Sequence, residues 1–392
     1  MHQISVLYSH IHHFYWELIP DYINENHNPN EIQWYFDVKL ARPKDPEDLS
    51  AQVGKEILAN LSLAAGTLSQ LQQALALLGG KFPIVMNIIP GGVSNFKITR
   101  STLIHVVRHL EQSKKFIEEI WPQDVKKLIM DVPETGDILD TNLNLISFGS
   151  LHTSGERDEV RQYSPGVLLA GKLEPLNELK ITESLDSTFY LPKTNQMGRE
   201  IHYIAPEKPG GITWIKGARY ENETMMTGAL SRMLVTHKGG GNPEISDTVG
   251  RMVDDLELSV ESLNCIAGRM LAEVIEGRAF FQSSMQILLN YSIDEELNLQ
   301  TSFDFSENGV GMGRIESPAG ALLHQVFIED GKIASYRIVG AANWNFAPRD
   351  KQGKRGVVER ELNRLYESGM TTPHKISRII HSYYGQVPDG TQ

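Results

Sequence analysis

Cysteine is almost absent from this sequence, since Cys265 is the single one among 392 residues. One cysteine cannot form an intramolecular disulfide, and alone it cannot hold an iron–sulfur cluster or a metal site built from several thiolates. A low cysteine count is typical of a reducing compartment, so we expect a cytoplasmic protein. We expect Cys265 itself to be a small buried side chain on a helix.

Long apolar runs and an excess of positive charge are missing too. No apolar stretch reaches the roughly 20 residues that a membrane helix needs, and the first residues do not have the pattern of a secretory signal. The chain has 37 Lys and Arg against 49 Asp and Glu, which gives a formal net charge of −12. Because an acidic surface repels phosphate backbones, we expect neither a nucleic-acid partner nor a membrane span.

The remaining composition is that of a globular protein, with 41% hydrophobic and 22% charged residues. The patterns predict four regions: a helical part at 1–131, a β-rich peripheral region at 132–215, long central helices at 216–300, and a hairpin region with a C-terminal helix at 301–392. No strong linker separates these regions, so we expect one integrated body.

Several helices can be placed from periodicity and capping residues. A helix with one buried face is predicted over the first 20 residues, ended by Pro20, and a long one over 47–78, with Asp48 or Ser50 as its cap and Gly79–Gly80 at its end. Further helical patterns lie at 101–120, at 245–291 with a break near Ser259, and at 357–381. The first helix carries His10, His12 and His13, which could bind a metal. Because no cysteine lies nearby and the HExxH spacing is absent, we expect instead that these histidines cap the helix or border a core.

Local motifs predict one hairpin but no catalytic residue. Asp330-Gly331 stands between the strand-like runs LLHQVFIE and KIASYRIV, which is typical of a type I′ turn. GVGMG at 309–313 and KGGG at 238–241 lack the frame of a phosphate loop, and no GxSxG serine-hydrolase motif occurs. Pairs such as Asp254-Asp255 fit solvated helix faces. The residues alone therefore predict no active site.

A longer stretch resembles a known family. GRIESPAGALLHQVFIEDGKIASYRIVGAANWNFAPRD at 313–350 is similar to the signature region of the [NiFe] hydrogenase large subunit, which typically reads E-(A/S)-P-R-G-A-L-x-H and, after a hairpin, P-T-T-W-N-x-S-P-R-D. SHIHHFYWELIPDY, GGKFPIVMNIIPGGV, NLISFGS, TWIKGARY and TGALSRML resemble further blocks of the family. The resemblance implies an α+β, helix-dominated fold: a central bundle of long helices with small peripheral antiparallel sheets.

The resemblance also implies where metal ligands would lie. Family members hold nickel and iron with four cysteines, in R-x-C-G-x-C near one end and H-S-F-D-P-C-x-x-C-x-x-H near the other. This sequence starts at the helix that follows the first motif, and its end reads IHSYYGQVPDGTQ, with Gln386 and Asp389 at the second pair of ligand positions. Thiolates suit such a centre because they are soft, anionic and able to bridge metals. The expectation is therefore no resident cofactor, at most a transient iron–cyanide–carbonyl unit, and no nickel.

The side chains that surround the family's metal site are partly retained. Ala319 replaces an arginine and can neither donate hydrogen bonds nor carry charge, and Asn343 replaces a threonine. Arg349 and Asp350 are expected to form a buried ion pair. The expected vestigial active-site shell, none of it catalytic, comprises Glu316, Pro318, Ala319, His324, Asn343, Trp344, Asn345, Pro348, Arg349, Asp350 and His381.

Three functions follow from the resemblance. The first is a non-catalytic large-subunit paralog that acts as a scaffold in hydrogenase maturation, with maturation chaperones or hydrogenase subunits as partners. The second is a structural or regulatory component that docks a hydrogenase small subunit. The third is an active nickel-dependent hydrogenase whose true N-terminus lies upstream of Met1, although a longer reading frame would leave Gln386 and Asp389 unchanged.

Overall fold

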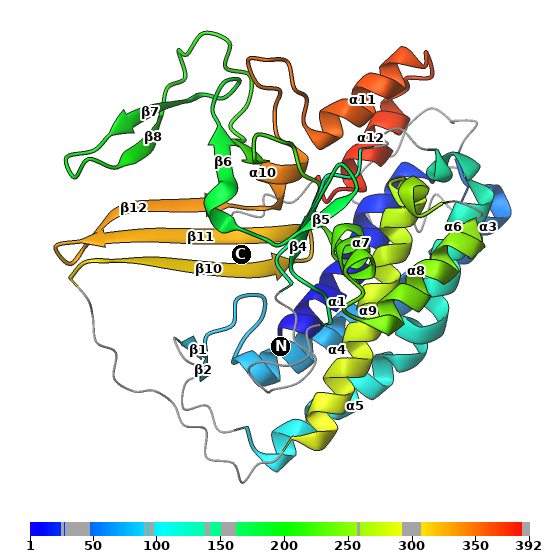
Figure 1. Cartoon of the computed structure of the whole chain (residues 1–392). Helices are drawn as coiled ribbons and strands as arrows, with labels where there is room; N and C mark the ends of the chain where they lie inside the picture. Colours follow the sequence, from blue (N-terminus) through cyan, green and yellow to red (C-terminus); the bar gives the residue numbers. More distant parts are fainter. Residues whose placement is uncertain are drawn as a thin grey trace.

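The computed structural model describes residues 1–24, 27, 48–89, 92–93, 98–137, 142–149, 162–256, 259–291 and 307–385. The long helices pack side by side on one side of the molecule, and the sheets extend away from them on the other (Figure 1). Helices α1 (His2–His12), α4 (Leu61–Gly79), α5 (Arg100–Lys115), α6 (Trp121–Asp131) and α9 (Ile266–Asn290) belong to the helical side. The four regions predicted from the sequence stay a prediction.

The first helix extends slightly past its predicted end. Helix α1 continues as a π-helical stretch, His13–Leu18, and a 3₁₀ turn, Ile19–Asp21. Pro20 is accommodated because it lies in the first turn of that 3₁₀ segment, where its missing N–H costs little. The buried apolar side chains of α1 face α9 and α4, against which the helix packs.

The helix predicted over 47–78 is in fact two helices, α3 (Ala51–Ala59) and α4. The chain breaks at Asn60, whose side-chain amide donates to both carboxylate oxygens of Asp124 at 3.0 and 2.9 Å. The predicted ends are confirmed: Ser50 caps α3 by accepting from the Val53 N–H, and α4 ends where Gly80 takes a φ of 83°. The break depends on a residue distant in sequence, which periodicity does not show.

Helical structure also continues beyond the predicted end at Ile120. Helix α5 passes through a π-helical stretch, Phe116–Ile120, into α6, because Pro122 lies in the first turn of α6. The predicted break near Ser259 separates α8 (Pro243–Leu256) from a 3₁₀ turn, Val260–Leu263, and from α9. Helix α7 (Ala229–Gly239) lies within the region 216–300 that was predicted to hold central helices, but its bounds were not predicted.

The strands form small antiparallel sheets. The longest, β10 (Gly309–Ser317), β11 (Gly320–Glu329) and β12 (Lys332–Val339), pair in that order. The predicted turn between β11 and β12 is confirmed, because Asp330 and Gly331 have φ values of 51° and 69°. The other strands are β1 (Ile88–Ile89), β2 (Gly92–Val93), β3 (Leu145–Ser147), β4 (Gly166–Leu169), β5 (Lys172–Glu174), β6 (Ile181–Ser184), β7 (Tyr190–Thr194), β8 (Glu200–Ile204) and β9 (Gly217–Tyr220).

The C-terminal part brings the end of the described chain back to the helices. After the short helix α10 (Ala341–Asn345), the helix predicted at 357–381 is divided into α11 (Val357–Glu367) and α12 (Pro373–His381). Thr372 caps α12 by accepting from the Lys375 N–H. Helix α12 contacts the chain that follows α1, so the end of the described chain lies against residues 13–21.

Two hydrophobic cores hold these elements. The larger lies among the helices, and the smaller lies under the sheets around Trp344, Tyr220 and Phe148. Cys265 is buried as predicted, but it is the N-cap of α9 rather than a residue within the helix, and its sulfur accepts from the Gly268 N–H at 3.4 Å.

Candidate functional site

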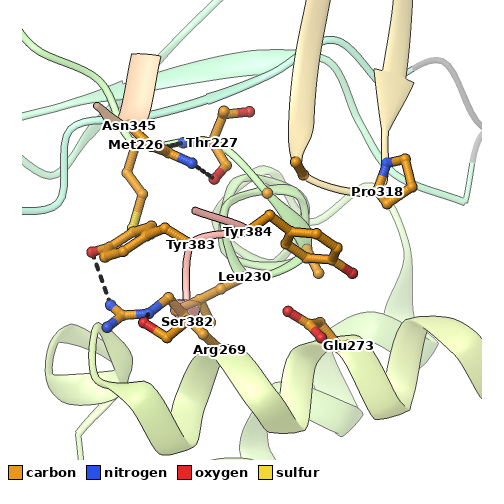
Figure 2. A pocket seen from close by; sticks show the side chains of 13 residues that line it. Met226, Thr227, Leu230, Arg269, Glu273, Pro318, Asn345, Ser382, Tyr383 and Tyr384 are labelled. Atoms are coloured by element: carbon orange, nitrogen blue, oxygen red, sulfur yellow. Dashed lines mark hydrogen bonds between the residues drawn. The ribbon is translucent and has the colours of Figure 1, made fainter. Parts of the chain in front are cut away.

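A small cavity lies where helices α7 and α9 meet the turn between β10 and β11. Its volume is about 20 Å³, room for roughly one water molecule. It is lined by the start of α7, the first turns of α9, the turn between β10 and β11, helix α10 and the chain after α12 (Figure 2). The lining residues are Met226, Thr227, Gly228, Ala229, Leu230, Arg269, Glu273, Pro318, Ala319, Asn345, Ser382, Tyr383 and Tyr384.

Tyr384 fills the space between this cavity and α1. Its hydroxyl hydrogen-bonds to Nδ1 of His10, and its ring stacks on the His13 ring with centroids 3.7 Å apart and planes inclined by 11°. Burial raises the pKa of this phenol well above its ordinary value, so the ring stays neutral. Figure 2 shows the Tyr384 ring close to the carboxylate of Glu273.

Two histidines on α1 and its extension meet two carboxylates on α9. Nε2 of His10 donates to Oε2 of Glu276 at 2.8 Å, and Nδ1 of His13 donates to Oε2 of Glu273 at 2.9 Å. Each pair is spaced three residues apart on its helix, which places both members on one face. Because α1 packs along α9, the two faces meet inside the protein.

Arg232 on α7 completes a buried ionic network. It donates to both oxygens of Glu276 and, through Nη1, to Glu316 at 2.8 Å, while Glu316 also accepts from the Phe148 N–H at 2.5 Å. Burial would raise the pKa of Glu276, but Arg232 and His10 lower it to about 2. Burial raises the pKa of Glu316 even though Arg232 opposes the shift.

A second buried arginine fixes the other side of the cavity. Arg269 on α9 binds the Glu361 carboxylate at 3.0 and 3.2 Å, and it donates to the Tyr383 hydroxyl at 2.9 Å and the Ser382 hydroxyl at 3.1 Å. Its guanidinium also lies 4.0 Å from the centre of the Tyr383 ring, within range of a cation–π contact. Arg269 therefore anchors the chain that follows α12 onto α9 and α11.

The structure brings some of the predicted shell residues together at this cavity. Pro318 and Ala319 form its rim at the β10–β11 turn, and Glu316 lies beneath them in the ionic network. Asn345 bonds the Thr227 backbone twice, at 3.0 and 3.1 Å. His381 contributes its main-chain oxygen, which accepts from Nε2 of His13 at 2.7 Å, while its ring donates to Asp21.

Other predicted shell residues lie elsewhere. His324 pairs with Tyr336 on the open sheet, and Asn343 caps α10 and donates to the Lys216 carbonyl. Trp344 belongs to the smaller core, and the Pro348 carbonyl accepts from Arg219 at 2.8 Å. The last two ligand-position residues, Gln386 and Asp389, lie outside the described residues.

The predicted ion pair between Arg349 and Asp350 is wrong. The Arg349 side chain is exposed, and Asp350 accepts instead from the backbone N–H groups of Gln352 and Lys354 at 3.0 and 2.9 Å. The carboxylate thus folds the following basic loop onto itself, which is a common use of Asp in turns. Arg349 therefore faces solvent, whereas the neighbouring Asp350 faces the backbone of its own loop.

Sequence reasoning missed most of the ionic network. His10 and His13 were expected to border a core, whereas they are fully buried and bonded to carboxylates. The available signal was the matching spacing of His10–His13 and Glu273–Glu276 on two apolar helices. Arg232 gave no such spacing signal, because the bounds of the helix that carries it were not predicted.

Comparisons with known proteins agree on one family. The family described as "Nickel-dependent hydrogenase" matches residues 56–384. The periplasmic [NiFeSe] hydrogenase large subunit of Desulfomicrobium baculatum is 26% identical, with 97% of this chain and 74% of that protein aligned. The quinone-reactive Ni/Fe-hydrogenase large chain of Wolinella succinogenes is 24% identical over 79% of this chain and 59% of its own length.

A solved structure shows the same fold. The [NiFeSe] hydrogenase of Desulfovibrio vulgaris Hildenborough, as a G491S variant, superposes with a TM-score of 0.79 at 25% identity, covering 97% of this chain and 78% of the other. The predicted hydrogenase large-subunit fold, with mixed helix and sheet, is therefore confirmed.

The prediction of no nickel is contradicted by the family match, because the family is described as nickel-dependent and its members are named [NiFeSe] and Ni/Fe hydrogenases. A cysteine count tests only thiolate ligation and does not address nitrogen and oxygen ligands. The side chains lining the cavity offer nitrogen, oxygen and the Met226 thioether, but no thiolate. Within the described ranges, no group of three or more His, Cys, Asp or Glu is arranged to hold a metal ion. These residues do not fit a centre held by cysteine thiolates.

The comparisons leave the compartment open. None of the helices in the described part of the chain is long and apolar enough to cross a membrane. One relative is named periplasmic. The cytoplasmic location stays a prediction.

Proposed function

From the premise that the chain belongs to the nickel-dependent hydrogenase family, we propose that it is a non-catalytic large-subunit homologue that serves hydrogenase assembly as a scaffold. The observation that carries this proposal is the position of Tyr384. Its side chain closes the cavity by bonding His10 and stacking on His13. A protein side chain thus occupies the interior at the junction of α1, α9 and the β10–β11 turn.

The charges around Tyr384 also favour a structural role. Arg232 joins Glu276 and Glu316, and Arg269 joins Glu361, so buried cations and carboxylates neutralise each other. Such networks hold elements in one geometry, because breaking either partner leaves an uncompensated buried charge. They connect α7, α9, β10 and α11. A rigid body of this kind suits a protein that presents a fixed surface to partners.

The rim of the cavity supports the same proposal. Ala319 is buried at the β10–β11 turn, and its methyl group brings neither charge nor a hydrogen-bond donor to the cavity. The resemblance implies an arginine at this position in hydrogen-converting relatives. Among the described lining residues, Arg269, Ser382 and Asn345 are engaged in structural hydrogen bonds, and Glu273 is bonded to His13.

A second function is favoured by one surface. Ile84, Met86 and Ile88 stand at every second position before and into β1 and are 56%, 70% and 62% exposed; we call these three residues the apolar stripe. Contiguous exposed apolar residues are typical of protein interfaces. Relatives are named large subunits or large chains. We therefore also propose, as the alternative, that the chain docks a hydrogenase small subunit in a structural or regulatory role.

Purification from cells that express a complete hydrogenase system separates these functions. The scaffold proposal predicts a stable complex with maturation chaperones and no hydrogen-dependent reduction of a viologen dye by that complex. A complex with a small subunit and no chaperone would favour the alternative. Binding to neither class of partner would overturn both, and hydrogen-dependent dye reduction would overturn the non-catalytic assignment.

A further inference from the structure

Both ring nitrogens of His13 face hydrogen-bond acceptors. Nδ1 lies 2.9 Å from Oε2 of Glu273, and Nε2 lies 2.7 Å from the main-chain oxygen of His381. An ionised carboxylate and a carbonyl can only accept, whereas a neutral imidazole has a single N–H. Both bonds form together only when His13 carries two ring protons. The fully buried His13 is therefore an imidazolium ion.

The surroundings of His13 supply negative charge for this ion. Oε2 of Glu17 lies 4.0 Å from Nε2 and has no hydrogen-bond partner among the described residues. Burial alone would lower the pKa of His13, but the charges of Glu273 and Glu17 and the two hydrogen bonds raise it. Three titratable groups near His13 belong to its own helical segment: His10, His12 and Glu17. Glu273 faces it from α9. His381, which is paired with Asp21, and Tyr384 face it from the end of α12.

The same ion holds the segment that follows α12. The His381 oxygen that accepts from His13 also accepts from the Tyr384 N–H at 2.9 Å. Tyr384 has a φ of 59°, a left-handed conformation that bulky residues rarely adopt, and its ring lies flat on the His13 ring. A residue in that conformation stays there only when its contacts hold it. Two contacts on one imidazolium, with the His381 oxygen and with the Tyr384 ring, therefore fix the end of the described chain.

We propose that the proton on His13 is a latch that fastens residues 381–384 onto α1 and α9, and that its loss releases this segment and opens the cavity beside Tyr384. The latch does not depend on the proposed function. The sign follows from linkage: the charged form is favoured in the closed state and the pKa of His13 is raised there, so the latch is fully present below the unfolded value near pH 6.5. It weakens as the pH rises through the pKa of His13 in the folded protein, by up to about tenfold per pH unit.

Two measurements on the full-length chain test the latch. Nitrogen-15 NMR of labelled histidine reports whether both ring nitrogens of His13 are protonated, and hydrogen–deuterium exchange reports the opening of the Tyr383 and Tyr384 amides. We expect the chemical shifts of an imidazolium at pH 6.5. We also expect the amide exchange rate, after correction for its intrinsic pH dependence, to rise with the same midpoint as the NMR titration. A neutral His13 at pH 6.5, or amides that stay protected through that midpoint, would overturn the proposal.

Adjacent histidines offer a matched pair of variants. His13→Gln can donate to only one of the two acceptors, so its Tyr384 amide should exchange fast at every pH. His12→Gln is the control, because His12 is 41% exposed and its Nδ1 lies 3.4 Å from Oε1 of Glu17, the oxygen that does not face His13. It should keep the wild-type pH response. A pH response that is lost in His12→Gln and kept in His13→Gln would contradict the latch; if His13→Gln does not fold, the wild-type measurements still decide.

Discussion

The guanidinium of Arg232 on α7 forms a two-pronged ion pair with the carboxylate of Glu276 on α9, with Nε–Oε1 at 2.8 Å and Nη2–Oε2 at 2.5 Å. Neither side chain is exposed to solvent. Parallel hydrogen bonds of this kind are the strongest that side chains form. The pair joins two helices whose residues are 44 positions apart, so the cavity is built around a long-range electrostatic contact.

Removing Arg232 should destabilise the fold strongly. Arg232→Leu leaves Glu276 and Glu316 as buried carboxylates without their cation, which costs about 3–5 kcal/mol of unfolding free energy. Urea denaturation measures the loss. Lys127→Leu is the control, because Lys127 forms a solvent-exposed pair with Glu56 and should change stability far less. Equal losses in the two variants would show that the buried network contributes nothing beyond a surface pair.

His2 should make the protein sensitive to acid. Burial lowers the pKa of its ring to about 4, although its hydrogen bond to the Glu316 carbonyl opposes the shift. The unfolded chain binds this proton near pH 6.5 and the folded chain does not, so stability falls as the pH drops from about 6.5 to about 4. The urea midpoint of wild type should decrease more over this range than that of His2→Gln. The opposite ordering would mean that His2 is charged in the folded protein.

Gly320 should tolerate no side chain. It has a φ of 137°, and a Cβ there would lie 2.3 Å from Thr227 Cγ2 and 2.9 Å from the Gly228 nitrogen. Gly320→Ala should cost about 2–5 kcal/mol through strain and overlap at the rim of the cavity. Gly171→Ala is the matched control: its φ is 78° and nothing lies within 4 Å of the added atom, so about 1 kcal/mol is expected. Thermal or urea unfolding ranks the two, and a larger loss for Gly171→Ala would contradict the packing at the turn.

The apolar stripe should matter for partner binding and not for folding. The double substitution Met86→Ser and Ile88→Ser removes exposed apolar area, so it should weaken a complex with a small subunit while leaving the unfolding transition unchanged. Met130→Ser is the control, since Met130 is 72% exposed on α6, away from the stripe in sequence. Affinity is read by biolayer interferometry. Equal affinity in the stripe variant and in wild type would remove this surface from the interface.

Local chemistry allowed parts of the fold to be predicted. The turn at Asp330–Gly331, the cap at Ser50 and the stop at Gly80 all depend on residues within a few positions, and each was found. The break at Asn60 was missed because it depends on a hydrogen bond to Asp124, 64 residues away. Sequence spacing does not reveal such a partner.

The site shows the same division. Glu316, Pro318, Ala319 and Asn345 were placed from the family resemblance, and the structure brings them to one cavity. Tyr384 carried no predicted role, because its contacts with His10 and His13 cross more than 370 positions. Long-range pairing of buried charges therefore determines the site, and local patterns such as the spacing of His10 and His13 indicate only one side of each pair.

The exchange of D₂ with solvent protons tests the central claim most directly, because it reports hydrogen activation without an electron acceptor. The protein would be purified from cells supplied with nickel and iron, with whatever subunit or chaperone accompanies it, and followed by mass spectrometry. The account predicts an exchange rate equal to that of a buffer blank, in wild type and in Tyr384→Ala alike. Exchange above the blank that increases with the concentration of wild-type protein would contradict the assignment of a non-catalytic scaffold.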